Sequence, residues 1–149
     1  MEPMLGTPLL AAARHGHEAV VKLLLETGRV DANSKDSNCF TPLFRAAQEG
    51  HEAVVKLLLE TGHVDADYRG HRGQTPLLAA VLRGHAAVVK LLLETGLVDA
   101  DSEDGMGWTP FSAVSSRHEE VVKLLQIHFA RKEGEALGIQ QVDKSGIRK

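Results

Sequence analysis

The sequence predicts an all-α repeat solenoid built of stacked helix-turn-helix units, with turn or hairpin connectors that project from the stack. Two repeated sequence motifs support this prediction. The dipeptide Thr-Pro begins at residues 7, 41, 75 and 109, each 34 residues after the one before. The text Glu-Ala-Val-Val-Lys-Leu-Leu-Leu-Glu-Thr-Gly occupies residues 18–28 and 52–62, and it recurs with one change at residues 86–96. A composition of 43% hydrophobic and 25% charged residues fits a globular chain of 149 residues.

The first helix of each unit is expected to begin at Thr-Pro. A threonine hydroxyl accepts a hydrogen bond from an early backbone N–H, and proline at the first helical position lacks a donor that would be unpaired there. Glycine ends the helix because it adopts a left-handed conformation without a Cβ clash. The helices predicted in this way are Leu9–His15, Leu43–Glu49 and Leu77–Arg83, ended by Gly16, Gly50 and Gly84.

The second helix of each unit is apolar on more than one side. In the first unit it carries Val20, Val21, Leu23, Leu24 and Leu25, and a glycine stops it. Such a helix needs cover on several sides, which neighbouring units provide in a stack. The polar segment that follows, RVDANSKDSNCF at residues 29–40, is too short for a further helix and is rich in turn-forming residues.

The order Thr-Pro-Leu, Ala-Ala, Gly-His, Val-Val, Leu-Leu-Leu and Gly resembles the ankyrin repeat from Thr7 to about Phe129. The period is one residue longer than the usual 33, and residues 10, 44, 78 and 112 are not the usual histidine. The motif Glu-Thr-Gly-x-Val-Asp-Ala resembles the repeats of the long ankyrin arrays of filamentous fungi. These arrays are often attached to nucleotide-binding immune-type receptors. The resemblance implies a protein-binding module in which the Gly-His pair stabilises the turn.

We expect one ankyrin repeat domain over residues 1–129, followed by an extended or loosely helical tail over residues 130–149. Its repeats are predicted at residues 7–40, 41–74, 75–108 and 109–129, the last of them a C-terminal cap. Glu120 and Gln126 stand in the cap where the second repeat has Ala53 and Leu59, and an end repeat needs a polar outer face. Only residues 1–6 precede the first Thr-Pro, so the chain is either a complete array or part of a longer one.

Charge and composition exclude several classes of function. The formal net charge of −3 argues against a general nucleic-acid binder. No apolar run approaches the roughly 20 residues of a membrane-spanning helix. The single cysteine, Cys39, favours a reducing intracellular location, in the cytoplasm or the nucleus. We therefore expect no nucleic-acid partner and no membrane partner, and we also expect a monomer.

Histidine and aspartate recur in the units but predict neither a metal site nor a catalytic site. His17, His51 and His85 hold one position in successive units, which a helix stack separates by about 8–10 Å, whereas a metal holds its ligands at about 2 Å. Asp65 and Asp67 stand in a short connector, where the side chains are expected to accept backbone N–H bonds; calcium binding or acid/base chemistry is the alternative. The chain carries no phosphate-loop or nucleophile motif, so we expect no enzyme activity and no cofactor.

The resemblance to ankyrin repeats implies that positions that vary between units form a concave binding face, on the connector tips and the exposed side of the first helices. The candidate partner-binding residues are Phe44, Arg45, Gln48, Glu49, Tyr68, Arg69, His71, Arg72, Leu78, Leu82, Arg83, Met106 and Trp108. Arg, Tyr and Trp are frequent anchors of interfaces. The arginines make the middle of this face basic, which predicts a protein partner with an acidic segment and one or two apolar anchors. For Trp108, packing on the neighbouring connector is the alternative role.

Two functional hypotheses follow. In the first, the chain is a protein-binding module that acts by surface complementarity alone. In the second, it is the sensor or scaffold array of a larger multidomain receptor of the nucleotide-binding immune type, whose activity lies in another domain. The sequence names no partner in either case.

Overall fold

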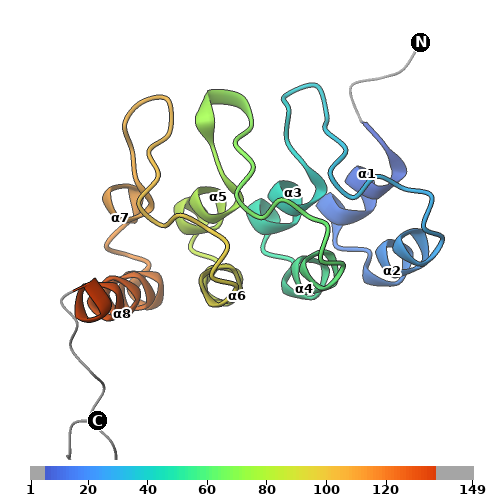
Figure 1. Ribbon diagram of the computed structural model, residues 1–149. Coiled ribbons are helices and arrows are strands. Elements are labelled where there is room, and N and C mark those ends of the chain that lie inside the picture. The colour runs from blue at the N-terminus through green and yellow to red at the C-terminus, as the bar shows by residue number, and fades with distance from the viewer. Residues whose placement is uncertain (1–5, 137–149) are drawn as a thin grey trace, which may run out of the picture.

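The computed structural model describes residues 6–136 as a row of helix pairs (Figure 1). In chain order the elements are α1 (Pro8–His15), α2 (Glu18–Glu26), α3 (Pro42–Glu49), α4 (Glu52–Glu60), the single 3-10 turn η1 (His71–Gly73), α5 (Pro76–Arg83), α6 (Ala86–Glu94), α7 (Pro110–Ala113) and α8 (Glu119–Ala136). Within residues 6–136 there is no β-strand, and the predicted all-α repeat solenoid is confirmed.

The helices form two layers, with the connectors along one edge. Helices α1, α3, α5 and α7 lie side by side in one layer, and α2, α4, α6 and α8 lie in the other (Figure 1). The connectors, residues 27–41, 61–75 and 95–109, rise past the first layer as loops at the top of the view. Each unit contacts mainly the unit before it and the unit after it, as in other linear repeats. None of the helices that the structure describes has the length and apolar character to span a membrane.

Thr-Pro begins the first helix of every unit as predicted. The side-chain oxygen of Thr7 accepts a hydrogen bond from the Leu10 amide at 3.2 Å. The threonines at residues 41, 75 and 109 cap α3, α5 and α7 in the same way. The proline that follows is the first residue of each helix, so the helices begin one residue earlier than the sequence predicts.

The glycine that ends a first helix also makes room for a side chain of the next unit. Gly16 has a φ of 74°, in the left-handed region. A Cβ on Gly16 would lie 2.6 Å from Nδ1 of His51, which belongs to the second unit. Gly50 and His85 repeat this relationship one unit later. Glycine is therefore needed here both for its backbone angle and for the close approach of a histidine ring.

The buried core lies between the two layers, and the inner second helices α4 and α6 are covered by both neighbours. Val54 is only 1% exposed, whereas Val20, its counterpart in the first unit, is 46% exposed. Val55 and its counterpart Val21 are both buried. The side that carries Val54 is thus covered by the preceding unit, which explains why the second helices are apolar on more than one side.

The fourth unit differs from the others in its first helix. Helix α7 is a single turn, and Val114 already has an extended backbone, so the residue that this unit lacks is missing from the end of the first helix. His118 still lies against Gly84, as His51 lies against Gly16. Helix α8 continues past residue 129 to Ala136, so no helix end coincides with the predicted start of the tail. Residues 137–149 of that tail lie outside the described residues.

One argument for the C-terminal cap is wrong. Ala53 is exposed in the second repeat, so Glu120 at the same position changes nothing in burial. Leu59 is half-buried and packs against the core. Its counterpart Gln126 is exposed, so the more polar outer side of the last repeat depends on Gln126.

Candidate functional site

Each connector begins with a turn that an aspartate side chain holds. The Oδ1 atoms of Asp31, Asp65 and Asp99 accept hydrogen bonds from the backbone amides two residues later, at 2.9, 3.1 and 2.9 Å. This confirms the predicted use of aspartate as a turn former. Among residues 6–136, no three His, Cys, Asp or Glu side chains are placed to hold a metal ion together.

Successive connectors are joined through Asn33 and its counterpart Asp67. Asn33 donates from Nδ2 to the His63 carbonyl oxygen at 2.8 Å and accepts at Oδ1 from the Asp65 amide at 2.9 Å. Asp67 accepts at Oδ2 from the Asp99 amide at 3.1 Å, but its buried Oδ1 has no partner within the described residues. Burial raises the pKa of the Asp67 carboxyl, although the hydrogen bond from the Asp99 amide opposes this shift.

The tip of the first connector is closed by Asp36. Its Oδ1 accepts hydrogen bonds from the amides of Asn38 and Phe40, at 2.9 and 3.0 Å. Its Oδ2 accepts from Arg45, at 2.8 Å from Nε and 2.7 Å from Nη2. Burial opposes ionisation, but the hydrogen bonds from Phe40 and Arg45 outweigh it and lower the pKa of the Asp36 carboxyl.

The Arg45 guanidinium is held by contacts with side chains of its own chain. Its guanidinium carbon lies 4.9 Å from the centroid of the Phe40 ring, and Nη1 donates to Oε1 of Gln48 at 3.1 Å. Phe40 in turn stacks on Phe44, with ring centroids 3.8 Å apart. The expectation that Arg45 adds free positive charge to the surface is wrong, because Asp36 neutralises it.

Two candidate residues lie beneath the surface, which corrects the expectation that they present apolar area to a partner. Phe44 is buried in a small apolar cluster with Phe40 and Ala79. Leu78 is buried and lines a pocket next to the third connector.

The other charged candidates lie on α3, α5 and the second connector. Nη1 of Arg83 lies 3.3 Å from Oε2 of Glu49, in an ion pair on the surface of α3 and α5. Arg69 is exposed and donates from Nη1 to the Glu103 carbonyl oxygen at 3.2 Å, which links the second and third connectors. A surface ion pair such as that of Arg83 and Glu49 contributes little stability and leaves both side chains accessible.

The tip of the second connector carries two exposed polar residues of the candidate set. His71 and Arg72 are exposed there. Tyr68 is half-buried, and Nζ of Lys35 from the preceding connector lies 4.6 Å from its ring centroid. Gln48 is half-buried on α3, so it contributes little to this tip.

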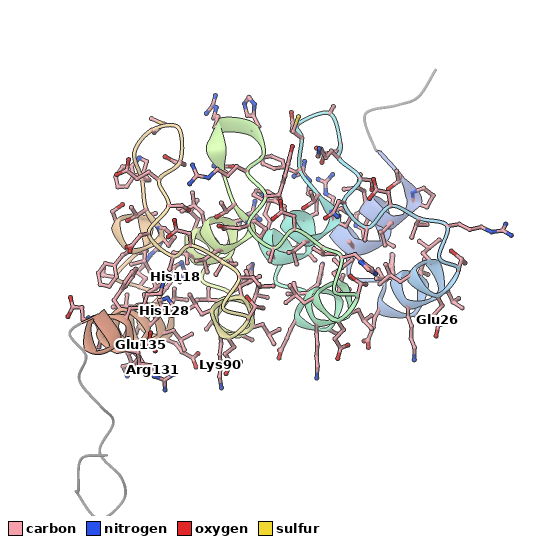
Figure 2. All side chains as sticks on the ribbon, viewed as in Figure 1. Glu26, Lys90, His118, His128, Arg131 and Glu135 are labelled. Carbon is pink, nitrogen blue, oxygen red and sulfur yellow. The ribbon has the colours of Figure 1, made fainter. Side chains whose placement is uncertain are left out.

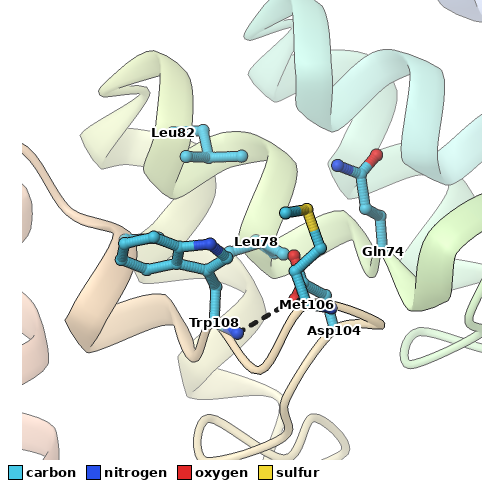
Figure 3. A pocket seen from close by; sticks show the side chains of 7 residues that line it. Gln74, Leu78, Leu82, Asp104, Met106 and Trp108 are labelled. Atoms are coloured by element: carbon cyan, nitrogen blue, oxygen red, sulfur yellow. Dashed lines mark hydrogen bonds between the residues drawn. The ribbon is translucent and has the colours of Figure 1, made fainter.

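The exposed apolar candidates surround a pocket of about 280 Å³ between α5, the third connector and α7 (Figure 3). The exposed fractions are 47% for Leu82, 74% for Met106 and 49% for Trp108. The Trp108 amide donates to Oδ1 of Asp104 at 2.9 Å, the dashed line in Figure 3. The structure therefore brings these three predicted residues together.

Three further residues of this pocket were not among the sequence candidates. They are Gln74, Asp104 and Ala113. Asp104 holds the position in the third connector that Asp36 holds in the first. Comparing the connectors position by position, instead of looking for large variable side chains, is the signal that could have found it.

The comparison with known families agrees with this architecture. The family model described as Ankyrin repeats (3 copies) matches residues 3–69 and again residues 62–134. The chain belongs to the ankyrin repeat family. No match was found among curated proteins.

A second groove lies on the opposite edge of the ankyrin array, between α6 and α8, with a volume of about 270 Å³. Lys90, His128 and Arg131 lie at this edge, away from the connectors (Figure 2). Nε2 of His128 is buried without a partner in the described part of the chain. Burial, followed by the charge of Lys132, lowers the pKa of His128. Glu94 also lines the groove, beside Lys90 and Arg131. The groove therefore carries charges of both signs and favours no single class of ligand.

Proposed function

We propose that this ankyrin array binds a protein partner on its connector face, and performs no chemistry of its own. The connector face is the concave face expected from the sequence: the connector loops and the exposed side of α1, α3 and α5. Ankyrin repeats are generally protein–protein interaction modules and are typically non-catalytic. The observation that carries the proposal is the cluster of Leu82, Met106 and Trp108, all exposed around one pocket. An exposed apolar cluster with a polar rim is typical of an interaction site.

The framework of the repeat does not require this cluster. Arg14 and Gln48 stand at the position of Leu82 in the first two units, so leucine is not needed there to build the helix pair. Asn38 and Arg72 likewise stand at the position of Met106. Contact with a partner therefore accounts for these side chains better than packing within the array does.

The second connector supports a finer expectation about the partner. His71 and Arg72 are exposed at its tip, and Arg69 is exposed beside them. Asp36 already neutralises Arg45, so the basic area is narrower than the sequence alone suggests. We propose that acidic side chains of the partner contact this tip, and that binding weakens with salt because rim charges are screened over about 8–10 Å.

Affinity capture from an extract of the source cells tests the proposed function. The baits are the wild-type chain, the double variant Leu82→Glu with Trp108→Ala, and the control variant Ala53→Glu. Ala53 is exposed on α4, in the other helix layer, so the control adds a similar charge away from the connector face. We expect one partner to bind the wild type and the control but not the double variant. Equal recovery on all three folded baits would contradict the proposal.

A second candidate function is a sensor or scaffold array within a larger receptor. The exposed side of the first unit supports it, because Val20 and Leu23 are exposed there while Val54 is covered by a preceding unit. A further repeat would cover this side. Sequencing of the full-length transcript tests the idea: upstream repeats support it, and a start codon at Met1 without upstream repeats contradicts it. For the chain alone we propose a cytoplasmic monomer, which gel filtration and imaging of a tagged chain test.

A further inference from the structure

The first and third connectors present an aspartate in the same way, but only the aspartate of the first connector has a cation from its own chain, Arg45 of α3. Asp104 and Trp108 stand two units, or 68 residues, after Asp36 and Phe40. We propose that the pocket beside Asp104 and Trp108 binds an arginine side chain of the protein partner, in the place that Arg45 takes beside the first connector. This inference rests on the proposed function and names the chemistry that the partner supplies.

The first connector shows how an arginine fits beside such an aspartate. The Asp36 carboxylate receives Nε and Nη2 of Arg45 at 2.8 and 2.7 Å. The same guanidinium lies 4.9 Å from the centroid of the Phe40 ring. A carboxylate and an aromatic ring thus hold the cation together, by charge-assisted hydrogen bonds and by a cation–π contact.

The third connector orients its carboxylate in the same way. Oδ1 of Asp104 accepts from the amides of Met106 and Trp108 at 2.8 and 2.9 Å, as Oδ1 of Asp36 accepts in the first connector. Ala113 of α7 stands where α3 has Arg45, and it lines the pocket of about 280 Å³. Among residues 6–136, no cation pairs with Asp104 and none lies over the Trp108 ring. The Asp104 carboxylate is thus in place without a cation. Trp108 lines the same pocket, with its ring on the side of Leu78 and Leu82, whereas Phe40 packs towards the next unit.

The second connector lacks the acid and the ring that the third connector has at the equivalent positions. Gly70 and Gln74 stand there at the positions of the carboxylate and the ring, and Ala79 of α5 stands at the position of the cation. A Cβ on Gly70 would collide with Phe40 of the preceding connector, so this position cannot carry an aspartate in the same conformation. The combination of an acid, a ring and a vacant cation position therefore occurs in the third connector and not in the second.

Arginine fits this pocket better than lysine does. A guanidinium is planar and offers a fork of N–H donors, so it can stack on the Trp108 ring while it bonds to the Asp104 carboxylate. An ammonium is a compact point charge and lacks this geometry. Leu82 and Met106 lie beside the pocket and can cover the aliphatic stem of an arginine side chain. A partner that contacts both connectors would thus place acidic groups at the second and an arginine at the third.

Trp108 is the only tryptophan in the chain, so its fluorescence reports on this pocket directly. The probes are three capped tripeptides, acetyl-Leu-X-Leu-amide, in which X is arginine, lysine or citrulline. Citrulline has nearly the shape of arginine but no charge. We expect saturable quenching by the arginine peptide in the millimolar range, a response at least about tenfold weaker with lysine, and none with citrulline.

Two variants of the full chain test the role of the named residues. Asp104→Asn keeps the Oδ1 acceptor that holds the turn but removes the charge, and we expect it to weaken binding of the arginine peptide at least about tenfold. Asp101→Asn makes the same charge change at an exposed position of the same connector and serves as the control. Ala113→Arg supplies the missing cation from within, so we expect it to abolish the response and to raise the thermal midpoint. In the reciprocal variant Arg45→Ala, the arginine peptide should restore part of the lost thermal midpoint.

Equal quenching by arginine and citrulline peptides, no quenching by either, or an arginine response that persists in Ala113→Arg would overturn the inference. Concentration-dependent self-association that Ala113→Arg abolishes would assign the pocket to a second copy of this chain and would also overturn it. The outcomes that contradict the proposed function differ from those that contradict the arginine pocket. A partner captured equally by the wild type and Asp104→Asn leaves that function standing without the arginine pocket, whereas a tripeptide response without any captured partner supports the pocket but not the function.

Discussion

Nε2 of His51 donates a hydrogen bond to the carbonyl oxygen of Arg14, at 2.9 Å, in the preceding repeat. His85 makes the same bond to the Gln48 carbonyl oxygen at 3.0 Å. The acceptors lie at the end of a first helix, where backbone carbonyls lack partners within the helix. The histidine of each Gly-His pair therefore ties its own unit to the unit before it.

Replacing His51 by alanine should lower the free energy of unfolding by about 1–2 kcal/mol, because one hydrogen bond between repeats and the packing of the ring against Gly16 are lost. His17 holds the same position in the first described unit and is exposed, so His17→Ala is a matched control with an expected loss below about 0.5 kcal/mol. Urea denaturation followed by circular dichroism measures both variants. Equal losses would show that the bond to the preceding repeat has no role.

The variant Asp67→Asn should be more stable than the wild type by about 1 kcal/mol at neutral pH. Oδ1 of Asp67 is buried without a partner among the described residues, whereas Asn33 at the same position donates to the carbonyl oxygen of His63. An asparagine amide at residue 67 has the corresponding carbonyl, that of Leu97, to donate to. Asp101→Asn, at an exposed position, is the control. A destabilised Asp67→Asn variant would contradict this account of the connector ladder.

The difference in stability between Asp67→Asn and the wild type should depend on pH in a defined direction. The pKa of Asp67 is raised above its usual 3.8 in the folded chain, so the folded state binds this proton more tightly than the unfolded state does. The Asp67 contribution to stability therefore increases as the pH falls from above the raised pKa towards 3.8, and it is lost as the pH rises through that window. The advantage of Asp67→Asn should shrink over this range. A constant difference between the two proteins from neutral pH to pH 3.8 would contradict the raised pKa.

The variant Cys39→Gly should raise the stability of the array by about 1 kcal/mol. Cys39 has a φ of 61°, in the left-handed region, and its counterparts Gly73 and Gly107 have φ of 72° and 82°. Glycine adopts this conformation without the steric cost that a Cβ brings. Cys39→Ser, which keeps the Cβ, is the control and should leave the thermal midpoint unchanged. An equal gain for serine would indicate thiol chemistry instead of backbone strain.

Much of the fold could be predicted because it depends on local chemistry that repeats. The Thr7 cap, the glycine at residue 16 and the glycine-like turn at Cys39 each follow from a few adjacent residues. The candidate site was less predictable because its contacts join residues that are not adjacent. Arg45 meets Asp36 across a whole connector tip. The burial of Phe44 depends on stacking with Phe40 of the preceding connector, a contact that the repeat pattern does not predict.

The double variant Arg69→Glu with Arg72→Glu should weaken binding of a captured partner and flatten its salt dependence. Both side chains are exposed on the second connector, where they would face acidic groups of the partner. Isothermal titration at two salt concentrations measures the effect, and Lys56→Glu with Lys90→Glu on the other helix layer is the charge-matched control. Unchanged affinity and unchanged salt dependence in a folded variant would remove this tip from the binding surface.

The emission of Trp108 during titration with the purified partner tests the central claim most directly. Trp108 is 49% exposed in the free chain, and as the only tryptophan it reports on the connector face alone when the partner itself carries none or carries a spectrally shifted analogue. Burial of its ring by the partner predicts a saturable blue shift that follows complex formation measured by sedimentation. A complex that forms by sedimentation while the Trp108 emission stays unchanged would show that the partner binds elsewhere.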